Sequence, residues 1–269
     1  MLAGFPMYDW PEVRDAADAF WSTLQHSLRT RGFDASDCLW REDDLASFWR
    51  SPDLLIGQTC GLPFATDLAS AVRLIGTPAY DIGCWPGFYY SVLIAPRGRS
   101  HSGLERFTGR VAVNDLKSQS GYATLMTSLM AAGADAAAIR IEMTGSHRAS
   151  VEAVADGRVD LAAIDAVSFQ LAKRHMAVAS EVEIVGNTLP TLGLPLITAL
   201  PEDARDALAD AMEEAVDRLG PAARETLLLT GFVRTDASAY APLAENWALV
   251  QAWLGLQAAA SVIPARISA

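Results

Sequence analysis

Apolar runs alternate with amphipathic stretches along most of the chain. Runs rich in branched and aromatic residues predict strands, and the stretches between them carry apolar residues on one helical side, as Phe20 and Leu24 do. Strands are predicted at residues 2–6, 53–57, 71–75, 88–95, 111–113, 139–143, 159–164, 182–185 and 194–198. Helices are predicted at about 11–30 (with Asp9 as N-cap), 122–132, 147–155, 165–174 and from Pro201 onward, with breaks at Gly220-Pro221 and near Gly231.

This alternation predicts an α/β protein with mostly parallel sheets. Strands and helices alternate up to about residue 95 and again from Val111 to Arg174, after which the chain returns to the part that it built first. A chain that leaves one lobe, builds a second and comes back crosses twice, and two crossings form a hinge beside a cleft. We therefore predict a first lobe of residues 1–95 and 185–269 and a second lobe of residues 96–184. The change of lobe is placed in the Gly-, Arg- and Ser-rich stretch 96–103.

Composition excludes several classes of protein. The chain of 269 residues has 21 Lys and Arg against 32 Asp and Glu, a net charge of −11 that argues against nucleic acid or an anionic membrane as partner. No apolar run reaches the roughly 18–20 residues of a membrane helix. The cysteines, Cys38, Cys60 and Cys84, lack CxxC spacing and predict free thiols with no zinc site. No cofactor and no metal are expected.

The start of the chain lacks the basic and apolar segments of an export signal. A cytoplasmic protein and an exported one whose leader has been removed therefore both remain open.

Polar residues follow most of the predicted strands. Because ligands in open α/β sheets bind beyond the carboxyl ends of strands, these residues are the candidate ligand-binding set. The set comprises Tyr8, then Gln58, Thr59 and Cys60, then Ser118, Gln119, Ser120, Gly121 and Tyr122, then Ser146 and His147, and finally Asp165.

The segment 118–122 is the most informative part of this set. Hydroxyl groups and a glycine precede a predicted helix, whose first N–H groups are unpaired and carry partial positive charge. A small tetrahedral anion could bind these groups together with Ser118 and Ser120. His147 opens the next helix and could donate to the same anion. The alternatives are a plain serine N-cap, a surface histidine, Asp165 as a helix cap, and half-buried tyrosines.

The same residues also allow an enzymatic interpretation. Ser120, His147 and Asp165 are the residue types of a hydrolytic triad, but no GxSxG surrounds either serine. The chain also lacks HExxH, GxGxxG and GxxxxGK[ST]. We expect no catalysis. The alternatives kept open are a cytoplasmic enzyme or sensor that acts on a small anionic metabolite through Cys60 or His147, and an interaction domain without a polar cleft.

The order of these motifs resembles a known family. It runs from Val113-Asn114-Asp115 and Ser118–Tyr122 through Gly145-Ser146-His147 to Ala163-Ile164-Asp165, and is similar to the phosphonate-, phosphite- and phosphate-type substrate-binding proteins of ABC importers. The resemblance implies a type II periplasmic-binding fold that closes on its ligand. It also implies a periplasmic location, an ABC permease as partner and a monomer. By the same resemblance, Ser118, Gln119 and Ser120 hold the anion with help from His147, and Asp165 matches an acid used for a ligand amine.

The chain also departs from the family pattern. Some members have aromatic residues where this chain has Gln58-Thr59-Cys60, and some have a second acid where it has Leu192-Gly193-Leu194. A simple oxyanion is therefore expected rather than an aminoalkyl phosphonate.

Overall fold

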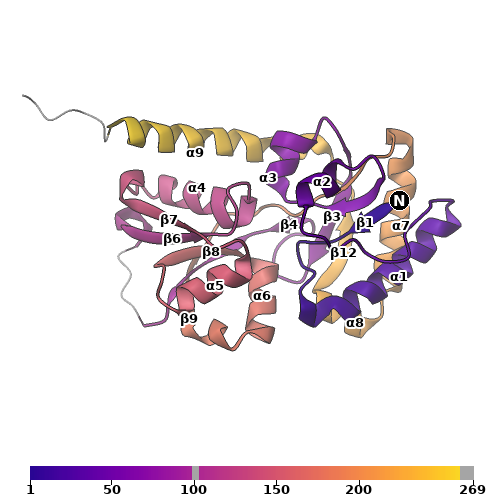
Figure 1. The fold of residues 1–269 in the computed structure, drawn as a ribbon, viewed down its shortest axis with the longest axis horizontal. Helices are drawn as coiled ribbons and strands as arrows, with labels where there is room; N and C mark the ends of the chain where they lie inside the picture. Colours follow the sequence, from indigo (N-terminus) through magenta and orange to yellow (C-terminus); the bar gives the residue numbers. More distant parts are fainter. Residues whose placement is uncertain (99–102, 261–269) are drawn as a thin grey trace, which may run out of the picture. The chain divides into compact units, whose positions relative to one another are not determined.

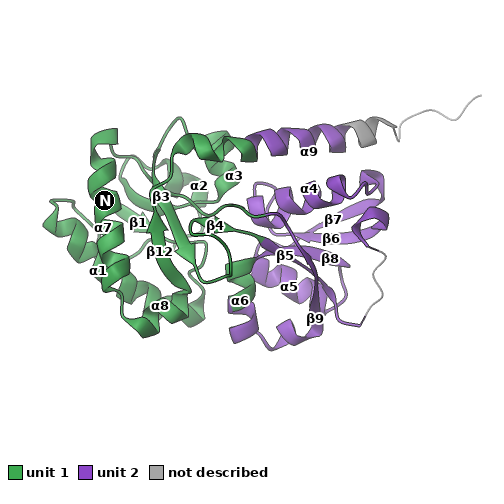
Figure 2. Ribbon diagram, turned by 180° about the vertical axis from the view of Figure 1, so that it is seen from behind, with its two compact units in different colours: residues 1–90, 166–170, 190–243 green, residues 91–165, 171–189, 244–269 purple. Residues whose placement is uncertain are grey.

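The computed structural model describes residues 1–98 and 103–260, so part of the predicted change of lobe, residues 99–102, lies outside the described residues. The chain divides into two compact units (Figure 2). Unit 1 consists of Met1–Tyr90, Ala166–Gln170 and Pro190–Leu243, and unit 2 consists of Ser91–Asp165, Leu171–Leu189 and Ala244–Ala269. The lobes predicted above stay a prediction; the compact units differ from them at residues 91–95, 166–170, 185–189 and from Ala244 onward.

Unit 1 contains a five-stranded sheet of order β1-β2-β11-β3-β12. The strands are β1 (Leu2–Gly4), β2 (Leu54–Gln58), β11 (Leu196–Thr198), β3 (Arg73–Tyr80) and β12 (Leu229–Val233). β1 is parallel to β2, and β11 is antiparallel to both β2 and β3. β1, β2 and β3 therefore run in one direction and end at the same edge of the sheet. Strands β4 (Phe88–Tyr89) and β10 (Thr191–Leu192) form a separate antiparallel pair.

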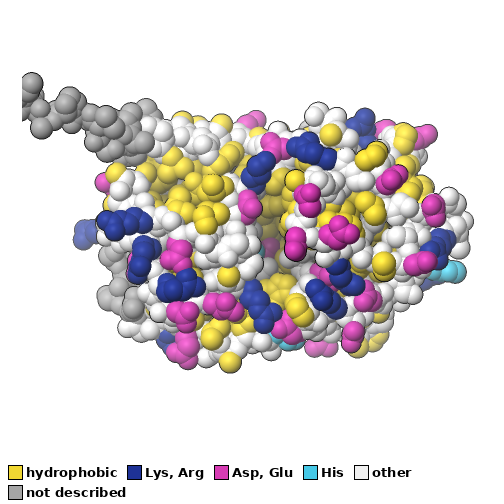
Figure 3. All heavy atoms as spheres, viewed as in Figure 1, with side chains coloured by type: hydrophobic (Ala, Val, Ile, Leu, Met, Phe, Trp, Pro, Cys, Tyr) yellow, Lys and Arg dark blue, Asp and Glu magenta, His cyan; other side chains and the backbone are white. Residues whose placement is uncertain are grey.

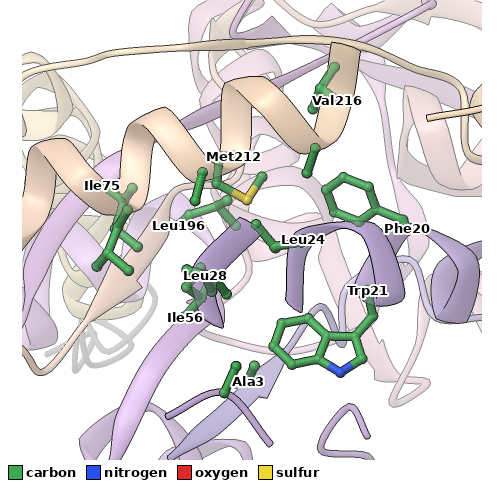
Figure 4. Close-up of a cluster of buried hydrophobic side chains, with 14 of the residues drawn as sticks. Ala3, Phe20, Trp21, Leu24, Leu28, Ile56, Ile75, Leu196, Met212 and Val216 are labelled. Atoms are coloured by element: carbon green, nitrogen blue, oxygen red, sulfur yellow. The ribbon is translucent and has the colours of Figure 1, made fainter. Parts of the chain in front are cut away.

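Helices pack on this sheet through one apolar side each. In α1 (Arg14–Thr30), Phe20, Leu24 and Leu28 recur every four residues and are buried. They contact Ile56 of β2 and Met212 of α7 (Arg205–Arg218) in the core drawn in Figure 4. The remaining helical elements of unit 1 are η1 (Pro11–Val13), α2 (Leu45–Arg50), α3 (Gly61–Pro63), η2 (Phe64–Leu68), η7 (Glu202–Ala204), α8 (Pro221–Leu227) and η8 (Ala237–Tyr240).

Unit 2 contains a second five-stranded sheet, of order β7-β6-β8-β5-β9. Its strands are β7 (Ile139–Met143), β6 (Gly109–Val113), β8 (Leu161–Asp165), β5 (Ser91–Pro96) and β9 (Val182–Asn187). β7, β6 and β8 are parallel, whereas β5 is antiparallel to β8 and β9. The carboxyl ends of the parallel strands and the amino end of β5 therefore lie at one edge.

In unit 2, α4 (Thr124–Ala131) covers one face of the sheet and α5 (His147–Ala155) covers the other (Figure 1). The core joins Leu125 and Leu129 of α4 to Val111 and Leu161 of the sheet. The other helical elements are η3 (Leu104–Arg106), η4 (Gln119–Ala123), η5 (Ala136–Ala138) and η6 (Ala177–Glu181). Helices α6 (Ala166–His175) and α9 (Ala241–Ala260) begin in unit 1 and end in unit 2. Over the described ranges, no helix is long and apolar enough to cross a membrane.

The α/β class is confirmed, but both sheets are mixed rather than mostly parallel, because the chain adds antiparallel return strands to each. The prediction that everything after Pro201 is helical is wrong, since β12 pairs with β3. The strand predicted at 71–75 continues to Tyr80, and the run 88–95 is divided between β4 and β5.

The predicted cap of the first helix is also wrong. The helical segment starts with η1, whose N-cap is Trp10 and makes no side-chain capping bond. The Asp9 carboxylate instead accepts a hydrogen bond from Arg41, with Nε and Oδ2 2.5 Å apart.

Candidate functional site

Polar side chains gather at the carboxyl edge of the unit 2 sheet. Asp165 is the last residue of β8, Asn114 follows β6, and Ser91 begins the antiparallel β5 at the same edge. Asp165 and Ser91 are register partners and both are almost completely buried. This is the edge at which α/β sheets bind ligands, so the geometry places three polar residues where the topology favours a site.

The segment 119–123 forms a single turn with π-helical hydrogen bonding before α4 starts. The Ala123 N–H donates to the Ser118 carbonyl five residues back, at 3.0 Å. Ser118 caps the turn, because its Oγ accepts the Gly121 N–H at 3.0 Å. The helix predicted at 122–132 thus begins earlier than expected. Ser118 acts as an N-cap, and its O–H remains able to donate to an anion.

Ser120 and His147 bring the starts of two helices together. The Ser120 Oγ and the His147 Nε2 are 2.8 Å apart. Ser146 caps α5, since its Oγ accepts the Ala149 N–H at 3.0 Å. Ser146 itself is exposed, whereas Gln119 and Ser120 are buried.

The protonation state of His147 follows from its surroundings. Burial lowers the pKa of His147 to about 4, so its imidazole is neutral at neutral pH. A neutral imidazole carries one N–H donor and one acceptor nitrogen. Within the described residues, Nδ1 is buried and has no hydrogen-bond partner.

This arrangement argues against the hydrolytic triad. A triad needs an acid bonded to the second ring nitrogen of the histidine, and His147 Nδ1 has no such partner in the described part of the chain. The thiolate pair was the other enzymatic alternative, and its members Cys60 and His147 belong to different units.

Ser91, which the sequence analysis did not select, ties the sheet edge to the π-turn. Its Oγ donates to the Ser120 carbonyl at 2.9 Å, and its N–H donates to Thr188 Oγ1 at 2.9 Å. Strand β5, which pairs with the strand that carries Asp165, is therefore joined to the turn that carries Ser120 through one buried hydroxyl. Ser91 stands inside an apolar strand run, so no signal in the sequence identified it.

Gly121 and Tyr122 contribute to the packing around this site. Gly121 lies directly against the Asn114 side chain, which leaves no room for a Cβ atom. Tyr122 is buried in the unit 2 core with its ring centroid 5.2 Å from that of Trp247, and burial raises its pKa. Tyr122 is therefore a core residue, and it would bind a ligand through its backbone N–H.

In unit 1, the predicted residues Tyr8 and Gln58 meet around Tyr80. Tyr8 and Tyr80 form an edge-to-face pair with centroids 5.1 Å apart, and Gln58 Nε2 donates to the Tyr80 hydroxyl at 3.1 Å. Gln58 and Tyr80 end β2 and β3, and Tyr8 follows β1. Tyr80 was missed because the strand prediction stopped five residues too early, before Pro78.

Thr59 and Cys60 continue from β2 into the start of α3. Thr59 is fully buried; its N–H donates to the Pro195 carbonyl at 3.0 Å, and its Oγ1 has no hydrogen-bond partner within the described ranges. Cys60 is buried and stands at the N-cap of α3.

Charges of both signs are mixed on the surface. Figure 3 shows Lys and Arg side chains interspersed with Asp and Glu on the face drawn. With a Debye length of about 8 Å at physiological salt, such a surface leaves short-range hydrogen bonds to decide whether an anion binds.

Solved structures share this fold. XAC2383 from Xanthomonas citri bound to chloride has 16% identity and a TM-score of 0.71, over 95% of this chain and 99% of that one. A binding protein component of an ABC phosphonate transporter from Pseudomonas aeruginosa has 16% identity and a TM-score of 0.68, over 95% and 86%. PhnD1 from Prochlorococcus marinus in complex with methylphosphonate has 15% identity and a TM-score of 0.67, over 88% and 94%. The fold is that of type II periplasmic binding proteins.

The family follows from the sequence itself. The profile of the ABC transporter phosphonate periplasmic substrate-binding proteins matches residues 53–240, and this chain belongs to that family. No curated protein matches the chain in sequence. Members of the family bind a substrate for a transporter and are not enzymes.

Proposed function

We propose that this protein captures a small phosphorus oxyanion, such as phosphate, phosphite or a simple phosphonate, for an ABC importer. The observation that carries the proposal is the Ser120–His147 hydrogen bond of 2.8 Å, which brings two helix starts to one edge of the unit 2 sheet.

The oxyanion would take hydrogen bonds from the first turn of η4, from the hydroxyls of Ser118 and Ser120, and from His147. A π-turn leaves the N–H groups of its first residues without acceptors inside the helix, and the helix dipole favours an anion there. Neutral His147 has one N–H, so while the bond to Ser120 is kept His147 donates to Ser120 and the Ser120 O–H donates to the oxyanion; direct donation by both groups requires that this bond open on binding. XAC2383 has been solved with chloride and with ATP, and PhnD1 with methylphosphonate. These anionic ligands of proteins with the same fold agree with the proposal.

The residues of unit 1 would contact the rest of the ligand. Tyr8, Gln58, Thr59 and Cys60 carry no formal charge as a set, which supports a simple oxyanion over an aminoalkyl phosphonate. The protein would close on its ligand as the predicted lobes move about their hinge, act as a monomer in the periplasm, and deliver the ligand to a permease. Asp165 would bind a ligand hydroxyl or a water.

Calorimetric titration with methylphosphonate, phosphite, phosphate, sulfate and 2-aminoethylphosphonate tests the ligand class. At least one phosphorus oxyanion should bind with micromolar or tighter affinity, and 2-aminoethylphosphonate should bind more weakly than methylphosphonate. Small-angle scattering should show a smaller radius of gyration at saturation. Binding of none of these anions would contradict the proposal, and an unchanged radius would contradict closure.

A further inference from the structure

The backbone carbonyl of Ser120 lacks the hydrogen-bond donor that a regular helix would give it. In an α-helix it would accept the N–H of Thr124, four residues further along the chain. In the π-turn that N–H donates to the Gln119 carbonyl instead, just as the Ala123 N–H donates to the Ser118 carbonyl. Ser120 is 4% exposed, so little water can reach its carbonyl to replace the missing donor.

Two side-chain hydroxyls take the place of this donor. The Ser91 Oγ donates to the Ser120 carbonyl at 2.9 Å, and the Thr124 Oγ1 donates to the same carbonyl at 2.8 Å. Ser91 and Thr124 are both buried. Because a carbonyl oxygen has two lone pairs, these two hydroxyls satisfy it completely.

The two hydroxyls come from different parts of unit 2. Thr124 bonds to the residue four positions earlier, a local arrangement that Thr127 repeats with the Ala123 carbonyl. Ser91 belongs to β5 and is 29 positions away from Ser120 in the sequence. Its N–H donates to Thr188 Oγ1 and its carbonyl accepts the Thr188 N–H, both at 2.9 Å, while β8 pairs with β5 on the other side. Ser91 is therefore a rigid anchor for the turn.

The π-helical hydrogen bonding of residues 119–123 depends on these donors. A buried acceptor without a donor is costly, and the turn would avoid that cost by changing to the α-helical form, in which the Thr124 N–H donates to the Ser120 carbonyl. This change shifts the hydrogen bonds before Thr124 by one residue. It would move the Ser120 Oγ away from the His147 Nε2, which now lies 2.8 Å from it.

We propose that Ser91 and Thr124 are positioning residues of the oxyanion site. Their hydroxyls hold residues 119–123 in the π-helical form, and this form keeps Ser120 on His147 and the first N–H groups of the turn in place for the oxyanion. Both residues act through the Ser120 carbonyl rather than by contact with the ligand. The inference rests on the proposed function for its ligand, whereas the effect on the turn can be measured without any ligand.

A double-substitution cycle tests the proposal by calorimetry with phosphate and methylphosphonate. Ser91→Ala and Thr124→Val each leave the carbonyl one donor, so each should weaken binding about threefold. The double variant leaves the carbonyl without a donor, and binding must then restore the π-helical form. Its affinity should fall about fiftyfold, more than the product of the two single losses. Ser91→Thr keeps the hydroxyl and should bind like the wild-type protein.

The imidazole nitrogens of His147 report on the turn in the absence of ligand. Their NMR signals, assigned with His147→Gln, should move in the double variant because Nε2 loses its bond to Ser120. The matched control is Thr198→Val in unit 1, which removes a buried hydroxyl that donates to the Leu54 carbonyl at 3.2 Å. This control should lower the free energy of unfolding and leave the His147 signals and both affinities unchanged.

The two proposals fail separately. If the wild-type protein binds neither anion while the His147 signals move in the double variant, the hydroxyls hold the turn and the proposed function is wrong. If the anions bind and the double variant loses no more affinity than the product of the single losses, or its His147 signals stay in place, the positioning role is overturned. Should the double variant not fold, equal affinities of Ser91→Ala and Ser91→Thr would overturn the positioning role, and recovery in Ser91→Thr alone would support it.

Discussion

The side-chain oxygen of Asn114 lies beside Gly121 and occupies the space that a Cβ atom on residue 121 would need. That Cβ would also meet Asn114 Cγ at 2.8 Å and His147 Cε1 at 3.1 Å. Gly121 does not have a positive φ angle, so its backbone conformation does not require glycine. Glycine is required at this position because the neighbouring side chains leave no room for a Cβ atom.

Gly121→Ala should disrupt both packing and binding. Because the added methyl group must displace Asn114 and press on His147, we expect a loss of about 1–3 kcal/mol in the free energy of unfolding. Phosphate affinity, measured by calorimetry, should fall because the Ser120–His147 bond must shift. Chemical denaturation supplies the stability measurement.

Removal of the clashing side chain provides the control for this substitution. Asn114→Gly in the Gly121→Ala background should recover most of the stability. Gly255→Ala, in α9 with nothing within 4 Å of the added Cβ, should not destabilise the protein. A Gly121→Ala protein with unchanged stability and affinity would show that the Asn114 contact is not maintained in solution.

Ser120→Ala should weaken oxyanion binding by about 1–3 kcal/mol, the usual effect of losing a hydrogen bond to a charged group. The substitution also removes the partner of His147 Nε2. The matched control is Ser128→Ala in α4, where Oγ donates to the Thr124 carbonyl at 2.8 Å. Wild-type affinity in Ser120→Ala, measured by calorimetry with phosphate, would remove this hydroxyl from the site.

The free energy of unfolding should fall between about pH 6.5 and pH 4 because of His147. Burial lowers the pKa of His147 from its usual 6.5 to about 4, so within this window the unfolded chain binds more protons than the folded one. The contribution is complete above pH 6.5 and is lost as the pH falls towards 4. Its size is on the order of 1–3 kcal/mol.

Comparison with His147→Gln isolates this effect. Acidic groups such as Glu213, whose pKa is lowered by its hydrogen bond from Arg234, add a loss of stability at lower pH in both proteins. The difference between the two pH profiles, measured by urea denaturation, should therefore change only across the window of His147. Parallel profiles from pH 7 to pH 4 would mean that the imidazole is solvated in the folded protein.

Much of the unit 2 site could be predicted because its strands and helices are short and their ends are marked by turn and capping residues. Strand β7 and helix α5 have the predicted bounds, since Ile139–Met143 alternates in hydrophobicity and Ser146 marks the helix start. Ser120 and His147 each follow a strand of one parallel set, so topology alone predicted that they would meet.

The parts that sequence patterns missed depend on contacts between distant segments. Strand β12 was taken for helix because Leu227, Leu228 and Leu229 are good helix formers, and only pairing with β3 favours the extended form. Ser91 lies at the site because β5 runs antiparallel beside β8. The Asp9 carboxylate does not cap the helix because it is hydrogen-bonded to Arg41, which lies far along the chain.

Tyr240→Phe should destabilise unit 1 without weakening phosphate binding by unit 2. The Tyr240 hydroxyl lies 2.7 Å from Thr77 Oγ1 and donates to the Gly193 carbonyl at 3.0 Å, and the side chain is fully buried. Because the substitution leaves both partners buried and unsatisfied, the free energy of unfolding should fall by about 1–3 kcal/mol. Tyr90→Phe is the matched control, since its half-buried hydroxyl makes a single longer bond to the Ile82 carbonyl at 3.2 Å and should cost less. Equal stability of the Tyr240→Phe and wild-type proteins in urea denaturation would mean that water reaches Thr77 and Gly193, and a parallel loss of phosphate affinity would mean that the unit 1 core supports the oxyanion site.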